Sequence, residues 1–516
     1  MLLASKGSMK FPQSRIYRVA IVLLIVFVFA VGVLLWAAHR LNPWMRQQVI
    51  NMLENRFDSE AEIQDLQVSL SPSISLHGTG LKLRHHGRTD VPPLIVIPEF
   101  WASESWRMFL REPWHLQLVK LRGLEIHMPP RGKEPLPPSR KTRDIPVQVD
   151  ELISDDATLE ILPNDPQKSP HVFLIHRLTM HSVGLGRSVP FQAALTNDTP
   201  PGEIAAQGQF GPWNIEDPRA TPLSASYTFE NADLGVFRGI SGILSSEGKF
   251  GGILERIEVE GETTVPDFEV KISGHPMMLK TKFNATVDGT NGNTLLHPVL
   301  AYFGHSTLSA NGGVVKAFTT KGREIVLDVA ASNARLEDLI ALGVKGDKPL
   351  MTGSVSLKTH FDLPPGDDEI VDRLKLKGQF GVEKARFTDE AVSEKVQGLS
   401  RRAQGEPKDE DAGSAVSALA GNFVLSNAVI TFRGLSFRVT GARIQVDGTY
   451  GLTSENLDFH GMAILDAKPS QMVTGVKSLL LKPFDPVFRK EGKTQLPIKI
   501  TGTRTSPSFG LELHKH

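Results

Sequence analysis

Hydrophobic and polar positions follow three successive patterns along the chain. Val19 to Ala38 is an apolar run without a charge, and as a helix it is long enough to cross the ~30 Å hydrocarbon core of a bilayer. Residues 42–57 then place apolar side chains near a helical period, which predicts a helix with Asn42 as its cap and Pro43 in its first turn. From residue 68 onward apolar and polar residues alternate, which predicts strands with one apolar face and one polar face.

The apolar run is interpreted as an uncleaved membrane anchor. Tyr17 lies before it and Trp36 and Trp44 lie at or beyond its end, as expected for aromatic rings at the two membrane interfaces. A cleaved signal peptide is the alternative, but its apolar stretch usually has about 7–15 residues. Basic residues without an acid precede the run, which favours a cytoplasmic N-terminus. We therefore expect a single-pass protein of the bacterial inner membrane with most of its chain in the periplasm.

Alternating strands fill most of the chain after the anchor. Val355-Ser356-Leu357 and Ile498-Lys499-Ile500 are examples, and Asp288-Gly289 and Asp447-Gly448 are interpreted as turns at strand ends. Short helices are predicted in four places: Ser103–Leu110, Ala334–Leu342, Asp389–Leu399 and Ser470–Leu481. This is too little helix to cover the apolar face of the sheet. We therefore expect a mainly β fold, with one elongated sheet rather than several ordinary domains.

One short pattern of glycine, a polar residue, phenylalanine and glycine recurs at irregular spacing. It occupies residues 208–211, 248–251 and 378–381. A degenerate repeat of strand and turn is one interpretation, and shared strand-ending chemistry is the other. The sequence does not decide between them.

Composition narrows the possible partners. Lys plus Arg and Asp plus Glu both number 57, so no basic surplus is available to neutralise phosphates, and nucleic acid is not an expected partner. The chain has no cysteine, which agrees with an oxidising compartment such as the periplasm. Its 45 glycines and 34 prolines are spread along the chain, which is typical of many short strands joined by turns.

Candidate catalytic or metal-binding groups are sparse. His85-His86 is the only adjacent histidine pair, and neighbours in a strand point to opposite faces, so a solvated turn is the preferred interpretation. The carboxylate pairs Asp155-Asp156 and Asp367-Asp368 are expected in surface loops. The segment after Asp288 lacks ligands that a calcium loop needs, and it is expected to be a turn between a strand and a helix. No metal, cofactor or catalytic residue is therefore assigned, and the chain is not expected to be an enzyme.

The order of segments resembles the AsmA-like family of membrane-anchored envelope proteins. The resemblance lies in the anchor with its short helix and first strand, in residues 288–292, in 374–380 with 397–405, and in the tail from Gly421 to Leu513. It implies a long, curved antiparallel sheet folded like a gutter, related to bridge-like lipid-transfer proteins built of repeating β-groove units. It also implies transport of phospholipids between the inner and outer membranes, or maintenance of the outer membrane. This chain is shorter than the largest members, so a partner or a shuttling mode is expected.

These patterns divide the chain into seven parts: a cytoplasmic N-terminus (1–18), the anchor (19–38), a first part of the groove (42–128), a proline-rich loop (129–146), a central groove (147–400), a polar loop (401–413) and an AsmA-like C-terminal region (414–516).

Phospholipid acyl chains are the expected ligand, bound by apolar residues on strand faces. The candidate groove residues are Leu374, Leu376, Phe380, Phe437, Val439, Ile444, Val446, Ile498 and Ile500. The alternative role for these residues is ordinary core under a helix or a second sheet. The alternative function is a non-enzymatic assembly factor or scaffold for outer-membrane proteins, which would need a protein partner in the outer membrane or periplasm.

Overall fold

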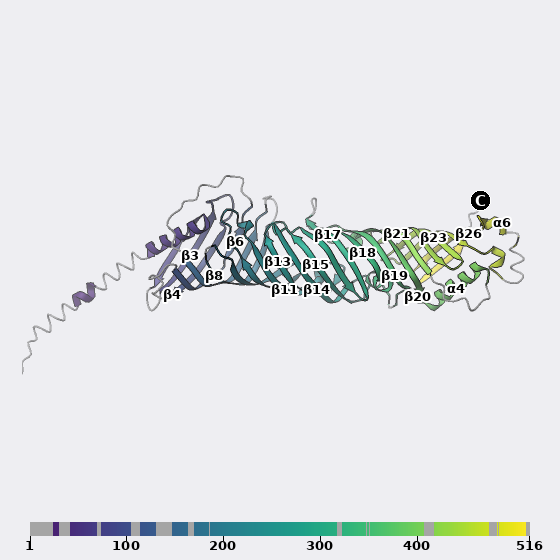
Figure 1. Ribbon diagram of the computed structural model, residues 1–516, viewed down its shortest axis with the longest axis horizontal. Coiled ribbons are helices and arrows are strands. Elements are labelled where there is room, and N and C mark those ends of the chain that lie inside the picture. Colours follow the sequence, from purple (N-terminus) through teal and green to yellow (C-terminus); the bar gives the residue numbers. More distant parts are fainter. Residues whose placement is uncertain are drawn as a thin grey trace, which may run out of the picture. The chain divides into compact units, whose positions relative to one another are not determined.

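The structure is a computed structural model that describes residues 24–29, 42–69, 74–104, 114–130, 147–163, 170–184, 186–316, 322–346, 348–349, 351–406, 417–473, 482 and 485–511 (Figure 1). Of the predicted anchor, only residues 24–29 are among them, and they are helical. No helix within the described ranges is both long and apolar enough to cross a membrane. Tyr17 and Trp36 lie outside the described residues, whereas Trp44 is described and is 49% exposed.

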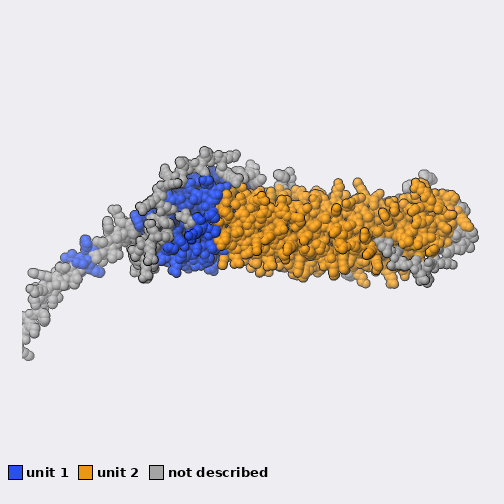
Figure 2. Space-filling model, in the orientation of Figure 1, with its two compact units in different colours: residues 1–164, 175–191, 212–218 blue, residues 165–174, 192–211, 219–516 orange. Residues whose placement is uncertain are grey.

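The chain forms two compact units (Figure 2). The first contains residues 1–164, 175–191 and 212–218, and the second contains residues 165–174, 192–211 and 219–516. Strands β8 (His171–Val183) and β9 (Val189–Asp198) contribute residues to both. In both units most described residues belong to strands, so the prediction of a mainly β fold is confirmed.

The first unit packs a helix against a small sheet. Residues 42–57 form the predicted helix, and the Asn42 side chain accepts a hydrogen bond from Val68 N at 3.2 Å, which ties the start of the helix to the sheet. Met45 and Ile50 pack with strand residues such as Leu83 and Phe100 in one buried core. The strands are β1 (Ser59–Glu62), β2 (Asp65–Ser69), β3 (Ile74–His85), β4 (Ile95–Glu104), β5 (Trp114–Arg122), β6 (Glu125–Met128) and β7 (Val147–Ile161).

Strand pairing in the first unit corrects the prediction of a purely antiparallel sheet. β1, β2 and β4 pair antiparallel with β3, and β5 and β6 pair antiparallel with β4. β7, however, runs parallel to both β5 and β6. A parallel neighbour needs a long return connection, and the predicted loop over residues 129–146 supplies that length.

The second unit is an antiparallel sheet whose strands lie side by side almost in sequence order (Figure 1). Among the strands of the described residues, the two-residue strands β12 and β25 alone depart from this order, because each pairs at the end of a longer strand. Its strands are β10 (Pro201–Phe210), β11 (Leu223–Asp233), β12 (Ile240–Ser241), β13 (Ile243–Ile253), β14 (Arg256–Val270), β15 (Met277–Val287), β16 (Thr294–Phe303), β17 (Ser306–Lys316), β18 (Arg323–Arg335), β19 (Met351–Leu363), β20 (Lys375–Phe387), β21 (Ser417–Ser426), β22 (Val429–Val439), β23 (Ala442–Gly451), β24 (Asn456–Leu465), β25 (Arg489–Lys490), β26 (Lys493–Thr503) and β27 (Ser506–Leu511).

Helices in the second unit are few and short, as predicted. The described ones are α2 (Leu336–Gly343), α3 (Ile370–Arg373), α4 (Glu390–Gln404) and α6 (Asp485–Phe488), with one-turn 3₁₀ helices at Leu234–Val236 and Pro469–Gln471. A further 3₁₀ helix, Pro218–Ala220, has its first residue in the first unit. α2 and α4 confirm two predicted helices, and Asp389 caps α4 by accepting a hydrogen bond from Val392 N.

The other two predicted helices lie partly outside the described residues. The helix at Ser103–Leu110 is wrong at its start, because residues 103 and 104 pair with β3 as part of β4, and its remainder lies outside the described residues. Of Ser470–Leu481, residues 470 and 471 belong to a 3₁₀ helix, and residues 474–481 lie outside the described residues.

Candidate functional site

The register of the second unit builds a continuous apolar row across its sheet. Residues directly opposite one another in paired strands point to the same face. Following these pairs from β10 to β24 gives a row without a charged side chain: Gly208, Ala225, Phe250, Val259, Ala285, Leu296, Gly312, Leu327, Phe361, Leu376, Leu425, Ile430, Tyr450 and Leu457. We call this the apolar row, and the face that carries it the inner face.

The two faces of the sheet differ in exposure. Most large residues of the apolar row, including Val259, Leu327 and Phe361, are half-buried. On the opposite, outer face, neighbouring positions such as Asp328 and His360 are exposed and are joined by a hydrogen bond of 2.9 Å. An apolar face that is less accessible than the polar one lies on the concave side of the sheet.

Glycines on the inner face mark places where strands approach closely. A Cβ added to Gly448 would lie 2.2 Å from Asp458 O, and one added to Gly248 would lie 2.2 Å from Glu260 O. Asp447-Gly448 is therefore not the predicted turn, because Gly448 sits inside β23 with no room for a side chain. Asp288-Gly289, in contrast, does form a turn, although strand β16 and not the predicted helix follows it.

The recurring pattern of glycine, polar residue, phenylalanine and glycine follows from the same face. In β10, β13 and β20 its first glycine and its phenylalanine lie on the inner face, and the polar residue between them is exposed. Gly248 lies beside the Tyr227 ring, where an aromatic side chain covers the backbone that glycine leaves bare. The pattern occurs within or at the end of strands in all three places, so it reflects inner-face packing.

Aromatic rings line the inner face in the C-terminal half of the unit. Phe380 of β20 lies 6.1 Å from Phe423 and 6.1 Å from Phe432, edge to face in both cases. Phe432 continues the contact to Phe459 of β24 at 5.8 Å. These rings make a wide apolar surface on the inner face.

Helix α2 covers the inner face at one end of its strands. Leu336 and Leu339 pack against a cluster that includes Val355 and Val382, which are 2% and 1% exposed. Farther along the same strands, Leu357 and Phe380 remain half-buried. The helix therefore buries the strand ends, whereas Leu357 and Phe380 in the middle of the strands are only partly buried.

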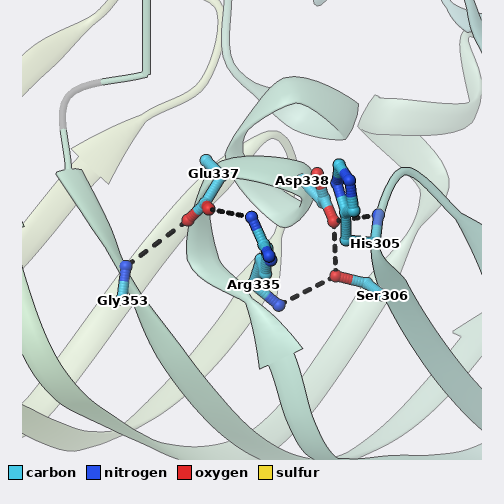
Figure 3. A network of polar contacts seen from close by, with 6 residues as sticks. All are labelled: His305, Ser306, Arg335, Glu337, Asp338 and Gly353. Carbon is cyan, nitrogen blue, oxygen red and sulfur yellow. Dashed lines mark hydrogen bonds and ion pairs between the residues drawn. The ribbon is translucent and has the colours of Figure 1, made fainter.

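Polar contacts hold α2 in this place (Figure 3). The Asp338 carboxylate accepts hydrogen bonds from His305 N at 2.8 Å and Ser306 Oγ at 2.7 Å, and Ser306 Oγ accepts one from Arg335 N at 2.8 Å. Glu337 pairs with Arg335 at 3.7 Å and accepts a weak hydrogen bond from Gly353 N at 3.4 Å. The helix is thus fixed to β17, β18 and β19 at once.

Helix α4 likewise covers the inner face at one end of β22, β23 and β24. Ala403 is fully buried against Val439, Ala442 and Leu465, and Phe437 and Leu496 pack at the edge of this cluster. Ser400 Oγ donates a hydrogen bond to Thr440 O at 2.8 Å, which ties the helix to the β22–β23 turn. Both helices lie along the same long border of the sheet.

The two long borders of this sheet come into contact. We name the border where β11, β14, β18, β20 and β24 end the first rim, and the border where they begin the second rim. Ile370 N, before β20 on the second rim, donates a hydrogen bond to Arg238 O, after β11 on the first rim, at 3.2 Å. Strands β13 to β19 lie between these residues in the sheet, so this stretch curls until its borders meet.

A second contact of the same kind lies farther along the sheet. A Cβ built on Gly346, on the first rim before β19, would lie 3.0 Å from Nη1 of Arg504, on the second rim after β26. The Arg504 side chain is held by Glu455 at 3.5 Å. We call the line of contact between the two rims the seam. A turn of roughly eight strands leaves an interior wide enough for side chains or one slender ligand.

A further polar contact joins the start of β8 to the second rim. The ring of His171 hydrogen-bonds the backbone of Asn291 in the β15–β16 turn. Burial lowers the pKa of His171, and the nearby cations Arg323 and Lys316 add to the effect. The inner face also has a polar spot, where Tyr227 Oη lies 3.2 Å from Ser246 Oγ and burial raises the pKa of the tyrosine.

The predicted groove residues all belong to one face. Leu376, Phe380, Phe437, Val439, Ile444, Val446, Ile498 and Ile500 lie on the inner face, whereas Leu374 precedes β20 as the residue that ends α3. Val439 and Phe437, however, pack against α4, so their position matches the alternative role of core under a helix. Ile257, Leu327 and Phe361 lie on the same face but were not among the predicted groove residues, although alternation with Glu258, Asp328 and Asp362 marks all three.

The histidine and carboxylate pairs considered as chemical candidates do not come together in one site. His85 is buried at the end of β3, not in the predicted solvated turn, and its ring centroid lies 3.8 Å from that of His86. Burial, with His86 adding to it, lowers the pKa of His85 to about 4. Asp155 and Asp156 lie within β7 rather than in a loop. Among the described residues no three His, Asp or Glu side chains are placed to hold a metal ion.

Neither protein-family models nor curated proteins nor solved structures give a significant match to this chain.

Proposed function

We propose that this chain binds phospholipid acyl chains along the inner face of its second unit and conducts them as a membrane-anchored protein of the bacterial periplasm. The observation that supports this most is the apolar row, which crosses the sheet from β10 to β24 without a charge and most of whose large side chains are half-buried. The resemblance to the AsmA-like family points to the same function, with lipid moving between the inner and outer membranes.

The energetics of lipid transfer require such a surface. The two acyl chains of a phospholipid hold about thirty CH₂ groups, and at ~0.8 kcal/mol each their exposure to water costs on the order of 25 kcal/mol. Only a continuous apolar surface replaces that contact with water at every step. Because the row has no charged position between Gly208 and Leu457, an acyl chain would pass no ionised side chain that it would have to desolvate.

The test places charge on the inner face. Leu327 and Phe361 are directly opposite in β18 and β19, and the double variant Leu327→Glu with Phe361→Glu puts two carboxylates in the middle of the row. We expect phospholipid that co-purifies with the full-length protein, measured by mass spectrometry, to fall at least tenfold. The matched control is Lys358→Glu with Gln379→Glu, an opposed and exposed pair on the outer face of β19 and β20.

Circular dichroism separates loss of lipid from loss of fold. If both double variants keep the wild-type β spectrum and only the inner pair loses lipid, the proposal holds. If wild-type protein carries no phospholipid, or if the inner pair unfolds the sheet while the outer pair does not, the inner face is ordinary core. A lipid-free protein that retains an outer-membrane protein partner would instead support the role of assembly factor.

A further inference from the structure

The contact between the two rims is small compared with the sheet that it closes. At the Ile370–Arg238 contact, Arg238 and Glu369 are exposed and α3 buries none of its residues. Each rim is fixed to its own side: Lys271 N donates to Gly239 O at 2.9 Å on the first rim, and Arg373 N donates to Glu369 O at 3.3 Å on the second. Across the seam, one backbone hydrogen bond is worth only about 0.5–1.5 kcal/mol.

A lipid with its tails on the inner face has only one place for its headgroup. A charged phosphate moved into an apolar interior without partners pays a desolvation cost of many kcal/mol. The headgroup must therefore project through the seam into water while the tails follow the apolar row. Where the rims touch, at Arg238 with Ile370 and at Gly346 with Arg504, a headgroup cannot pass unless they part.

We propose that the seam is a lateral gate, which opens at the contact between the β11–β12 segment and α3 to let a phospholipid headgroup pass. This rests on the proposed function, since it assumes that acyl chains occupy the inner face. The rims would form the gate, whereas the apolar row would hold the acyl chains. Opening breaks the backbone hydrogen bond from Ile370 N to Arg238 O and separates Gly239, which is buried, from Ile370, which is half-buried.

A covalent lock across the rims tests the gate. The natural chain has no cysteine, so Arg238→Cys with Ile370→Cys introduces the only two thiols. A backbone hydrogen bond joins these residues, which brings their Cα atoms into the range of a disulfide or of a short bifunctional thiol reagent. The control pair is Glu247→Cys with Glu262→Cys, which are directly opposite on the outer face of β13 and β14 and lock neighbouring strands without crossing the seam.

The measurement is transfer of a fluorescent phosphatidylethanolamine from donor vesicles that carry the full-length protein to protein-free acceptor vesicles. We expect locking of the seam pair to slow transfer at least tenfold, reduction to restore it, and lipid loaded before locking to stay bound without exchange. The locked control pair should transfer at the wild-type rate.

Each other result has one meaning. If the locked seam pair transfers lipid at the rate of its reduced form, the gate is wrong, while the lipid-binding function stands. If the two thiols cannot be joined, as judged by mass, the rims do not meet in solution and the gate is equally wrong. If the reduced pair and the wild type neither bind nor transfer lipid, the proposed function itself fails.

Discussion

Several glycines on the inner face lie where a larger side chain would clash with the neighbouring strand. Gly448, Gly461 and Gly378 each lie opposite a strand whose backbone would come within about 2–2.5 Å of an added Cβ. At these positions the sheet curves so tightly that hydrogen alone fits on the concave side. Glycines on the outer face meet no such obstacle, since a Cβ on Gly251 would lie 3.5 Å from its nearest neighbour, Ser224 Cβ.

The first prediction compares these two kinds of glycine. Gly448→Ala should destabilise the second unit by on the order of 1–3 kcal/mol, because the methyl group forces β23 and β24 apart. Gly251→Ala should leave stability unchanged or raise it slightly, since alanine lowers the entropy of the unfolded chain. Thermal unfolding followed by circular dichroism measures both. Equal melting temperatures for the two variants would mean that the inner face has room for side chains at Gly448.

The second prediction concerns His85, which is 8% exposed and has a pKa of about 4 in the folded protein against 6.5 as its ordinary value. Folding favours the neutral imidazole, so this group contributes its full stability above pH 6.5 and loses it as the pH falls from 6.5 toward 4. The loss should be on the order of 2 kcal/mol between pH 7 and pH 5, because one pKa unit corresponds to about 1.4 kcal/mol.

Tryptophan fluorescence is suited to this measurement. The tryptophans at positions 36, 44, 101, 106, 114 and 213 are the six in the chain, and all belong to the first unit. The urea midpoint reported by fluorescence should therefore fall on acidification, and His85→Gln should flatten that dependence. His115→Gln, at an exposed position of β5, is the control that should keep the wild-type slope. An unchanged slope in His85→Gln would assign the acid sensitivity to other groups.

At the scale of elements, alternation predicts strands and their faces well. Lys375 to Lys377 and Ile498 to Ile500 were assigned to strands from period two alone, and the inner and outer sides follow from the same alternation, whereas Leu374, assigned with them, precedes the strand. Helices α2 and α4 were also predictable, because each combines a helical period with acids in its first turn. The acids of α2 have a second use, since Asp338 and Glu337 bind neighbouring strands rather than solvent (Figure 3).

Neither the seam nor the parallel direction of β7 could be predicted from the sequence. Alternation says which side chains share a face but not how tightly the sheet curls, and curling decides whether Arg238 meets Ile370. The seam contacts also use backbone atoms and loop residues, which have no distinctive composition. Likewise, a long connection over residues 129–146 permits either direction for β7, and only pairing with β5 and β6 decides it.

At the scale of the whole molecule, the proposal needs a fixed orientation with respect to the membrane. The run from Val19 to Ala38 is expected to hold the chain in the inner membrane, with residues 1–18 in the cytoplasm. The second unit would then work in the periplasm, where lipid in transit must be shielded from water. An orientation with the second unit in the cytoplasm is incompatible with transport toward the outer membrane.

The absence of cysteine makes this orientation measurable with single thiols. Ser454→Cys places one on the exposed β23–β24 turn, and Ser8→Cys places one before the anchor. In cells with a permeabilised outer membrane and an intact inner membrane, a membrane-impermeant maleimide should label the Ser454→Cys protein. The Ser8→Cys protein should react only after the inner membrane is lysed. Labelling of Ser8→Cys in intact cells, with Ser454→Cys protected, would reverse the orientation and remove the periplasmic role.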